Sequence, residues 1–446
     1  MAKEKNRHAA IVGAGLSGLT AAYRLQQAGW RVSIFERADR AGGRVKTVSR
    51  DGYLIDTGAS ALADSYKSYL ALAAELGLAD EIKATAPSIG IYRDGQLHEL
   101  RMDRLLHAGL QTRVLSKSAK LRLLRLVWDI AIARLRGQLD YTDMRRAAPL
   151  DTESARDYAH RALSQEIDDY LGSPIVRTML IANSDAVSKV ELLSGIANIF
   201  SARILALRGG QGRLPNLLAA RVSPRFQHTV VRVLKHDVGV MVGYRDPQGT
   251  QHDEHFDACV VCCPLPDAVQ MCVDQRALLE PLCAGLTYTQ CITVALGLNR
   301  PPRSPTFLVS MPACEDAEIA LLFLDHNKAT DRAPPGCGLI DCHWETAAAT
   351  RMMERPDEEI VERSLATVLR VFPEVQGHVV FSHVTRWRHA LPFTVVGAYR
   401  RIGDFNAAID PRSPIQFASD YMSAAGQNTA VELGNRAAQR LCSSEP

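Results

Sequence analysis

The 446-residue sequence predicts an α/β protein of two domains. A chain of this length is too long for one ordinary core, which favours two domains or so. The first 36 residues read as a strand, a helix and a second strand, the order of a βαβ unit. Later stretches alternate between β-branched strands and amphipathic helices. We therefore expect one Rossmann-type nucleotide-binding domain and a second domain with a mixed β-sheet and helices.

The composition is that of an ordinary globular protein. Charged residues make up 23% and hydrophobic residues 47%, and the formal net charge is +3. Bulk charge therefore gives no reason to expect nucleic acid as a partner. No run reaches the roughly 18 uncharged apolar residues of a membrane-spanning helix. The opening MAKEKNRHAA is a short charged lead without the apolar core of a signal peptide. We expect a cytoplasmic protein.

All ten cysteines lie in the second half of the chain, and the closest set is CVVCCP at 259–264. A CxxC pair suggests a metal or redox site. However, Cys259 and Cys262 stand in a β-branched run, so they would point to opposite faces of a strand. No second CxxC completes a zinc site. We therefore predict a buried structural strand here and no metal site.

Periodicity and turn signals predict the order of the remaining elements. A helical zone begins near residue 151, where Asp151 or Thr152 could cap it. The predicted strands are 8–12, 31–36, a meander over 229–264, 290–298, 319–324, 338–343 and 378–386. The predicted helices are 16–28, one that follows the glycine-rich turn within 207–222, 357–375 and 429–441.

Residues 101–136 carry nine Arg or Lys against two Asp. Apolar residues there fall at helical spacing: Leu121, Leu124, Trp128, Ile132 and Leu135. One interpretation is a basic amphipathic surface that touches a membrane or an acidic partner. The other is a helical wall with solvated arginines. This second interpretation is favoured. Leu123, Val127 and Ile130 are also apolar and leave only a narrow polar stripe, which is typical of a mostly packed helix.

The stretch AAIVGAGLSGLTAAYRL, residues 9–25, contains a complete GxGxxG spacing. Gly13 permits the tight turn, Gly15 lets backbone approach a pyrophosphate, and Gly18 lets the helix pack closely on the strand. Amides at the helix N-terminus would face the phosphate oxygens. The second strand ends in Glu36, eighteen residues beyond Gly18. A carboxylate there accepts hydrogen bonds from a ribose diol and repels a 2′-phosphate. The spacing leaves NAD or FAD as the cofactor.

The continuation ERADRAGGRVKT, residues 36–47, favours FAD. It places a second flexible turn and Arg44 just after the acidic strand end, where a guanidinium can neutralise a pyrophosphate that continues toward a flavin. At this point the sequence resembles the flavin amine oxidase superfamily, which includes protoporphyrinogen oxidases and phytoene desaturases. Similar segments follow in the expected order over nearly the whole chain: GYLIDTGASAL (52–62), LRGGQGRLPNLL (207–218), TVVRVL (229–234), VTRWRHALP (384–392) and IQFASDYMSAAGQNTAVELGNRAA (415–438).

The resemblance implies a site for FAD. It places Gly58 and Ala59 under the isoalloxazine ring and Asp420 on the ribityl chain. The backbone of Val230 would meet the adenine. The C-terminal helix, beginning at Thr429, would point its N-terminus at the pyrimidine ring and stabilise the negative charge of reduced flavin. The implied cofactor-binding residues are Gly13, Gly15, Ser17, Gly18, Glu36, Arg37, Gly43, Arg44, Gly58, Ala59, Val230, Trp387, Asp420, Thr429 and Ala430.

The resemblance also implies how the chain divides into domains. We expect a discontinuous FAD-binding domain made of 1–85, 205–265 and 385–446. The substrate-binding domain would comprise 86–204 and 266–384, with a helical subdomain at about 101–200.

Several departures from the family pattern bear on the substrate. Ser419 stands where the family usually has Gly before the aspartate of the closing motif. Gln290 is near the place where amine oxidases often have a lysine facing flavin N5, and Gly426 replaces the aromatic residue that often walls the amine site. The segment after Trp387 lacks the cysteine that carries the covalent flavin link in some relatives. We therefore expect noncovalent FAD and a largely apolar substrate.

The expected function is that of an FAD-dependent oxidase or dehydrogenase. It would take a hydride from a small molecule, at a C–H next to nitrogen or in a C–C unit, and pass electrons to oxygen or another acceptor. No second GxGxxG follows a strand, so we expect no nicotinamide domain. The catalytic candidates are Tyr288, Gln290 and Trp387. A non-redox flavoprotein such as an isomerase remains the alternative, and the sequence sets no oligomeric state.

Overall fold

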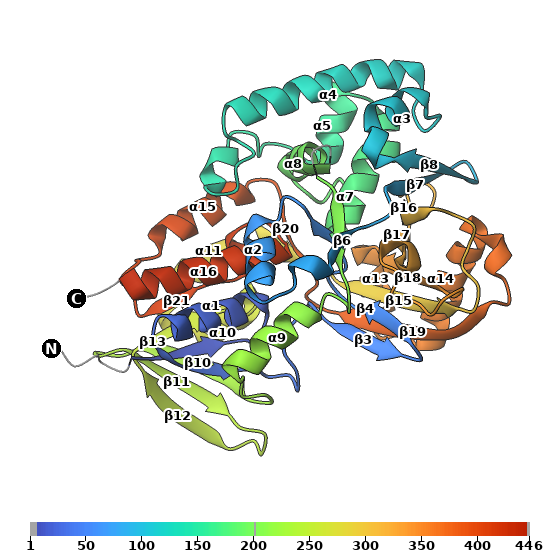
Figure 1. Ribbon diagram of the computed structural model, residues 1–446. Coiled ribbons are helices and arrows are strands. Elements are labelled where there is room, and N and C mark those ends of the chain that lie inside the picture. The colour runs from blue at the N-terminus through green and yellow to red at the C-terminus, as the bar shows by residue number, and fades with distance from the viewer. Residues whose placement is uncertain (1–6, 200–201, 444–446) are drawn as a thin grey trace.

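The computed structural model describes residues 7–199 and 202–443. A four-stranded parallel sheet in the order β2-β1-β13-β21 carries the N-terminal glycine turn (Figure 1). Its strands are β1 (His8–Val12), β2 (Arg31–Phe35), β13 (Ala258–Val261) and β21 (Ile415–Phe417). Helix α1 (Leu16–Gln27) connects β1 to β2. The predicted strand–helix–strand unit is therefore confirmed, with its ends shifted by a single residue at most.

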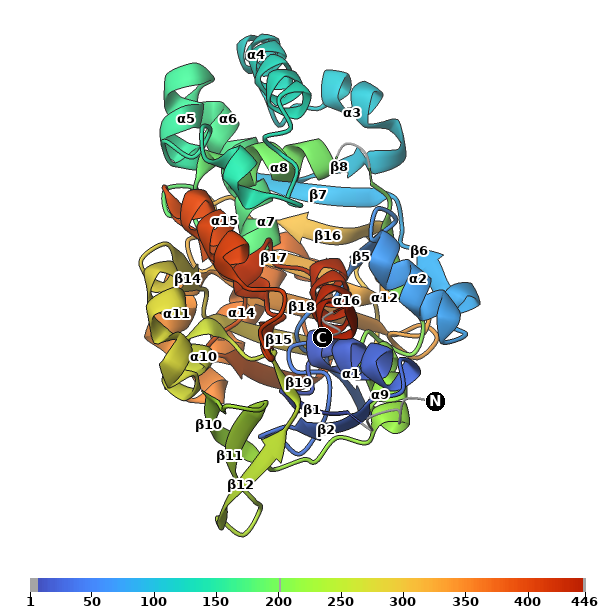
Figure 2. The ribbon, with the colours of Figure 1, turned by 90° about the vertical axis from the view of Figure 1, so that its left-hand side faces the viewer.

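Helix α16 (Gln427–Ser443) packs along α1 (Figure 2). The contact is close because a Cβ on Gly434 would lie only 2.9 Å from Thr20 Cβ and 3.1 Å from the Ala21 backbone nitrogen. The C-terminal helix therefore closes the layer that covers the parallel sheet. Because the sheet takes strands from three distant stretches of the chain, it forms only when all three come together. The domain boundaries themselves remain a prediction.

Smaller elements surround this sheet. An antiparallel meander follows helix α9, as predicted, and the hairpin of β3 and β4 leads away from the glycine turn. The elements are α9 (Arg213–Val222), β10 (Thr229–Lys235), β11 (Val240–Arg245), β12 (Gln251–Phe256), β3 (Thr47–Arg50), β4 (Tyr53–Asp56), β5 (Leu62–Ala63), α2 (Lys67–Glu75), β6 (Ile82–Ala84), β9 (Ile204–Leu207), α10 (Leu265–Met271) and α11 (Arg276–Cys283).

A seven-stranded mixed sheet forms the other large layer, in the order β19-β15-β18-β17-β16-β7-β8. Only β16 and β7 pair in parallel. The elements are β7 (Ser88–Arg93), β8 (Gln96–Arg101), β15 (Cys291–Leu298), β16 (Thr306–Ser310), β17 (Ile319–Leu324), α12 (Asp325–Lys328), β18 (Gly338–Trp344), α13 (Thr346–Met352), α14 (Asp357–Val371) and β19 (Val379–Trp387). Helices α13 and α14 cover one face through a core that includes Trp344 and Ile360. The other face turns toward the hairpin of β3 and β4. The strands predicted within 290–386 are confirmed.

A helical region lies above both sheets in Figure 1. Its helices are α3 (Leu105–Gln111), α4 (Lys117–Leu135), α5 (Ala155–Ala162), α6 (Gln165–Ile167), α7 (Ser173–Leu180) and α8 (Lys189–Ile199). The predicted cap of the helical zone at Asp151 or Thr152 is wrong. Ser154 caps α5 by accepting a hydrogen bond from the Asp157 backbone N–H. Asp151 instead accepts the backbone N–H of Tyr399 at the start of α15 (Ala398–Ala408).

Helix α4 differs from the favoured interpretation of residues 101–136. Ala119, Leu126, Ile130 and Ala133 are buried against the helical core, as a packed helix requires. The opposite side exposes large apolar side chains: Leu121, Leu124, Val127, Trp128 and Leu135. The interpretation as a mostly packed helix is therefore wrong for this face, because periodicity does not show which side of a helix the rest of the chain covers.

The predicted buried strand at Cys259 is confirmed. Cys259 lies in β13 and is fully buried, and burial raises the pKa of its thiol well above the ordinary value. In the part of the chain that the structure describes, no cluster of His, Cys, Asp or Glu could hold a metal ion. Within the same residues, no helix is long and apolar enough to cross a bilayer.

Candidate functional site

The glycine turn between β1 and α1 is bare of side chains on the side away from the sheet. Gly13 has φ +100°, a conformation that favours glycine. A Cβ on Gly18 would overlap the Gly13 carbonyl oxygen, so only glycine lets the helix approach the strand this closely. A Cβ on Gly15 would meet nothing within 4 Å. The turn therefore has the open cradle and close helix packing that a pyrophosphate site needs.

The second glycine pair adjoins this cradle. The Gly42 backbone N–H donates to the Ala14 carbonyl at 2.8 Å. A Cβ on Gly43 would lie 3.4 Å from Gly15 Cα, so the two turns meet backbone to backbone. Arg40 donates to the Gly43 carbonyl at 3.1 Å and supports the turn, a role that the sequence analysis did not assign.

Glu36 follows β2 and lies beside the cradle. Its carboxylate accepts the backbone N–H groups of Ala14 at 2.7 Å and Ala38 at 2.8 Å. Its own backbone carbonyl accepts the N–H of His228 at 2.9 Å, just before β10. This bond brings the start of β10 next to Glu36. Val230 lies near that start, at a shift in the strand register, and its backbone is the group predicted to meet the adenine. Arg37, the next residue, pairs with Asp267 at 3.2 Å.

Arg44 joins four segments of the chain. Its Nη2 lies 2.6 Å from Asp420 Oδ2, and its Nη1 donates to the Ala390 carbonyl at 2.9 Å. The Tyr288 hydroxyl donates to Asp420 Oδ1 at 3.0 Å and accepts the Leu265 backbone N–H at 3.2 Å. Burial opposes the guanidinium charge, but Asp420 holds the pKa of Arg44 above its ordinary value. The predicted cofactor residues Arg44 and Asp420 thus form one ion pair.

Tyr288 is part of this network rather than a free acid or base. Burial, and then the charge of Asp420, raise the pKa of Tyr288 far above its ordinary value. The hydroxyl therefore stays protonated at neutral pH. Its geometry makes Tyr288 a positioning residue for the Arg44–Asp420 pair.

Trp387 contacts the segment that the resemblance places under the flavin ring. The indole Nε1 donates to the Thr57 carbonyl at 2.6 Å. A Cβ on Gly58 would lie 3.4 Å from the Trp387 ring and would overlap the Arg44 carbonyl oxygen. Ala59 donates its backbone N–H to that same carbonyl at 3.0 Å. Gly58, Ala59, Arg44 and Trp387 therefore lie together, although they are far apart in sequence.

The closing helix begins near the same place. Helix α16 starts at Gln427, two residues before the predicted start at Thr429, and the Ala430 N–H donates to the Gly426 carbonyl at 3.1 Å. The Ser17 hydroxyl donates to the Ala418 carbonyl, which ties α1 to the segment carrying Asp420. The predicted residues of the first and last motifs are thus brought together.

The register of the large sheet shows which residues share the face of Trp387. Cys291 lies directly opposite Trp387, so both project to one face. Gln290 immediately precedes Cys291, so its side chain would project to the opposite face of the sheet. Its backbone N–H donates to Thr346 Oγ1 at 2.9 Å. Cys291 therefore fits this face better than Gln290. The apolar cluster at this end of the sheet comprises Ile181, Cys291, Phe307, Leu308, Ala320, Leu321, Phe323 and Ala390, with Trp387 packed against it.

A buried ion pair lies on the same face and was missed from the sequence. His343 stands opposite Thr293 in the register, and its Nε2 lies 3.0 Å from Asp341 Oδ2. Burial opposes the charge of the ring, but Asp341 raises the pKa of His343 to about 10. Burial also raises the pKa of Asp341. His343 stands two residues after Asp341 in the predicted strand 338–343, so both side chains project to one face. This spacing was the sequence signal for the pair.

A second buried charge cluster joins the two layers. Asp56, at the end of β4, lies 3.1 Å from Arg332 and 3.6 Å from Lys328, and all three side chains are fully buried. Its Oδ1 also accepts the Thr47 hydroxyl at 2.7 Å and the Gln211 N–H at 2.9 Å. The glycine-rich motif at 207–218 is therefore anchored on the hairpin of β3 and β4. No local sequence signal indicates this cluster.

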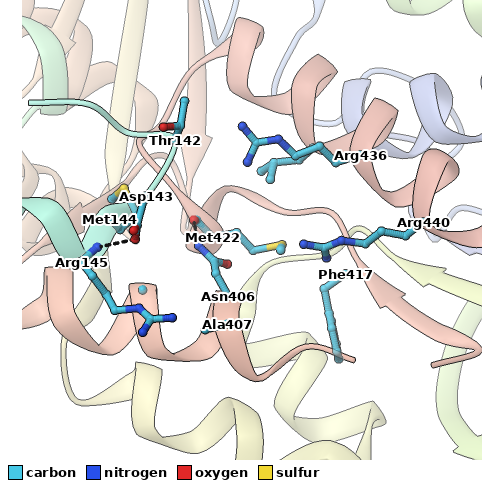
Figure 3. A pocket seen from close by; sticks show the side chains of 12 residues that line it. Thr142, Asp143, Met144, Arg145, Asn406, Ala407, Phe417, Met422, Arg436 and Arg440 are labelled. Carbon is cyan, nitrogen blue, oxygen red and sulfur yellow. Dashed lines mark hydrogen bonds between the residues drawn. The ribbon is translucent and has the colours of Figure 1, made fainter. Parts of the chain in front are cut away.

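A separate cavity of about 220 Å³ lies between α15, α16 and the loop before α5 (Figure 3). Arg145, Arg436 and Arg440 contribute to its lining, together with Asn406. Asn406 donates its amide N–H to the Met422 carbonyl at 2.8 Å and so supports the segment that begins at Asp420. None of the predicted cofactor residues lines this cavity, so it is distinct from the candidate site.

The residues gathered around the glycine turn fit a flavin dinucleotide. The bare cradle suits a pyrophosphate, Glu36 stands where a ribose diol would lie, and Gly58 and Trp387 meet at the expected ring position. The fold and this lining define a flavin-dependent oxidoreductase. The chain belongs to the flavin containing amine oxidoreductase family, whose sequence profile matches residues 16–442.

Three comparisons illustrate the relationship. The chain is 21% identical to coproporphyrinogen III oxidase of Bacillus subtilis, over 92% of each chain. It is 28% identical to mitochondrial protoporphyrinogen oxidase of Nicotiana tabacum, over 41% of this chain and 34% of that one. The chain thus spans about a third of the tobacco protein. Cyclohexylamine oxidase from Brevibacterium oxydans superposes with a TM-score of 0.78 over 98% of this chain and 99% of that one, at 20% identity. This last likeness concerns the fold alone.

Proposed function

We propose that the chain holds FAD noncovalently and dehydrogenates a porphyrinogen, a largely apolar ring system that contains nitrogen. The observation that carries the proposal is the largely apolar cluster packed against Trp387, which includes Phe307, Leu321 and Phe323. The buried His343–Asp341 pair lies beside it on the same face of the sheet. A face of this kind suits a large tetrapyrrole macrocycle better than a small charged amine. The relative from Bacillus subtilis, matched over nearly its whole length, supports the same substrate class.

The cofactor would be held by the residues that the motifs single out. The Gly13–Gly18 turn and Gly43 would face the pyrophosphate, and Glu36 the adenosine ribose. Arg44 would hold Asp420 in place for the ribityl chain. The absence of a cysteine after Trp387 in VTRWRHALP supports noncovalent attachment. When bound, FAD supplies a hydride acceptor, which no side chain can provide.

The protein's own contribution is position and charge. The N-terminus of α16 carries a partial positive charge, which would favour negative charge on a flavin bound beside it. Trp387, fixed by its bond to Thr57, would wall the ring. Protonated Tyr288 keeps Asp420 in place rather than moving a proton. Removal of a hydride from a meso carbon of a porphyrinogen would leave a cation delocalised over the adjoining pyrroles, and loss of a pyrrole N–H proton to water would complete the dehydrogenation. The lack of an obvious dedicated base is compatible with this reaction.

The predicted division into domains belongs to the proposal. FAD would lie on the parallel sheet of 1–85, 205–265 and 385–446, and the substrate on the large sheet of 86–204 and 266–384. Electrons would leave to oxygen, which gives peroxide, or to another acceptor. We also propose a cytoplasmic location, which is supported by ten cysteines that are all free thiols.

The test is aerobic turnover by purified protein on a panel of porphyrinogens and primary amines, with peroxide as the readout. We expect peroxide and porphyrin absorbance with coproporphyrinogen III or protoporphyrinogen IX, and none with putrescine. Acid treatment should release FAD from the denatured chain. Turnover of amines alone would overturn the substrate class. Isomerised product without peroxide would favour the non-redox alternative.

A further inference from the structure

The cavity between α15, α16 and the loop before α5 gathers positive charge. Arg145 contributes from the loop, and Arg436 and Arg440 contribute from α16 (Figure 3). Because Arg436 and Arg440 are four residues apart, they lie on one side of the helix. Among the described residues, Asp143 supplies the single carboxylate of the lining, and its Oδ1 accepts the Arg145 backbone N–H at 3.1 Å. The lining is therefore cationic overall.

The two arginines of α16 repel each other. Burial lowers the pKa of Arg440, and the charge of Arg436 lowers it further. Like charges at this spacing destabilise a helix. Within residues 7–199 and 202–443, the Arg436 side chain forms no hydrogen bond or salt bridge. Arg440 Nη1 donates to a neutral acceptor, Gln416 Oε1, at 3.4 Å. A bound anion would offset this gathered charge.

Two further carboxylates near the cavity are engaged by the loop before α5. Asp404 lies 3.8 Å from Arg145 Nε. Asp140 lies 3.4 Å from Arg146, and Arg436 acts on it only beyond salt-bridge distance. The cations that these carboxylates pair with are therefore those of the loop, and Arg436 stays directed to the cavity.

Asn406 adds an unused acceptor to the lining. Its Nδ2 donates to the Met422 carbonyl at 2.8 Å, whereas its Oδ1 is buried and has no hydrogen-bond partner. The Thr142 hydroxyl lines the same cavity. Guanidinium groups bind phosphate oxygens through paired N–H donors, and inorganic phosphate at neutral pH still carries an O–H. The lining therefore offers donors for the charged oxygens of a phosphate and an acceptor for its proton.

The size and position of the cavity suit a small ligand. Its volume of about 220 Å³ is several times the roughly 30 Å³ that a water molecule occupies. It is a hollow between three segments rather than a flat face, which favours a small molecule over a protein surface. Asn406 also holds Met422, the last residue of the short turn that begins at Asp420. A ligand here would brace the segment that carries Asp420.

We propose that this cavity binds a phosphate group, carried by inorganic phosphate or by a small phosphate ester, with Arg436 and Arg440 on its charged oxygens. The bound phosphate bridges α16 to the turn that begins at Asp420, and it slows the release of the flavin. The effect on the flavin rests on the proposed place of Asp420 at the ribityl chain, whereas the binding of phosphate does not. The site is separate from the glycine turn that would hold the pyrophosphate of the cofactor.

The experiment is thermal unfolding and calorimetric titration of the flavin-loaded full chain, freed of unbound flavin. The ligands are sodium phosphate and adenosine monophosphate, each compared with sodium chloride at matched ionic strength. We expect a saturable rise in the unfolding temperature with at least one phosphate ligand, and none with chloride. R436Q/R440Q should bind phosphate about tenfold more weakly or worse. R436K/R440K should fall between, because it keeps the charge and loses the paired donors.

The matched control is R125Q/R276Q, which removes two arginines that pair with exposed-helix carboxylates away from the cavity and should bind phosphate normally. All variants should keep the flavin spectrum in chloride, which shows that the fold is intact. A response to inorganic phosphate alone assigns the free ion, and tighter binding of adenosine monophosphate assigns an ester; both support the site.

Two results would overturn the site. One is a response to phosphate no larger than the response to chloride, and the other is equal phosphate binding by R436Q/R440Q. Flavin release during gel filtration tests the link to Asp420. It should be severalfold slower in phosphate for the unaltered protein and unchanged for R436Q/R440Q. Equal release rates with and without bound phosphate would refute that link.

Discussion

The flavin side of the molecule and the outer face of α4 both carry cations, but the two regions differ in the partners of these cations. Near the candidate site, Arg44 lies 2.6 Å from Asp420 and Arg332 lies 3.1 Å from Asp56. Both pairs join residues more than 270 positions apart. On α4 the cations border exposed leucine and tryptophan, with Asp129 as the only acidic residue of the helix.

This contrast shows what each region is built for. Buried pairs between distant segments hold those segments in one geometry, and loss of one partner leaves an uncompensated charge. Arg125 on α4, by contrast, pairs with Asp129 in the same helix, an exposed contact that joins no distant segments. Substitutions in the first region should therefore change stability or flavin binding, and substitutions on α4 should change neither.

The largest effect is expected for Asp56→Asn. Lys328 keeps Asp325 at 2.7 Å, but Arg332 loses the carboxylate at 3.1 Å, so we expect a loss of about 3–5 kcal/mol in the free energy of unfolding. Urea unfolding measures it. The control is D103N, which breaks an exposed pair with Arg101 and should leave stability unchanged. Equal unfolding midpoints for the two variants would mean that the buried cluster does not hold the layers together.

The next effect concerns Arg44→Met. Asp420 then loses its cation, and the segments that meet at the predicted ribityl site are no longer fixed. We expect flavin affinity to fall by about 3 kcal/mol, roughly a hundredfold in Kd. Flavin content after gel filtration and titration of the apoprotein measure it. R276M is the matched control, because Arg276 forms an exposed pair with Glu280 in the same helix and should not affect flavin. Flavin loss in R276M with retention in R44M would reverse this assignment.

A smaller effect is expected for Glu36→Gln. The substitution keeps the size of the side chain and removes the charged acceptor for the ribose diol, so FAD affinity should weaken by roughly 1–3 kcal/mol. The neighbouring exposed Asp39→Asn serves as control and should bind FAD normally. Unchanged affinity in E36Q would contradict the placement of the adenosine ribose.

The smallest effect tests the helical region by pH. Glu153 accepts hydrogen bonds from Arg161 at 2.7 Å and Lys189 at 2.8 Å, and these cations lower the pKa of Glu153 from 4.5 to about 2. A lowered pKa stabilises the fold above pH 4.5, and this stabilisation is lost as the pH falls through about 2. The stability difference between the unaltered protein and E153Q should therefore be full at pH 6 and small near pH 2. A difference that grows on acidification would contradict the ion pairs.

Local signals predicted the nucleotide-binding part well. The strand–helix–strand unit, the glycine turn and the buried strand at Cys259 depend on residues close in sequence, where side-chain period and turn geometry act directly. The Arg44–Asp420 pair could be anticipated only in part. The resemblance named both residues, but their contact joins the two ends of the chain.

Features that depend on distant contacts escaped prediction. Asp151 was predicted to cap a helix, but its carboxylate accepts the backbone N–H of Tyr399, 248 residues away. Ser154 caps α5 instead. The Asp56 cluster has no local pattern, because its partners come from another layer. The exposed side of α4 was misjudged because an apolar stripe has the same spacing whether or not another element covers it.

Anaerobic stopped-flow reduction of the bound flavin is the decisive measurement for porphyrinogen dehydrogenation. The oxidised flavin absorbance should fall rapidly on mixing with coproporphyrinogen III or protoporphyrinogen IX, and it should recover when air is admitted. NADH and NADPH should reduce the flavin very slowly, because no nicotinamide motif follows a strand in the sequence. Rapid bleaching by NADPH at micromolar concentration, with no response to either porphyrinogen, would contradict the account.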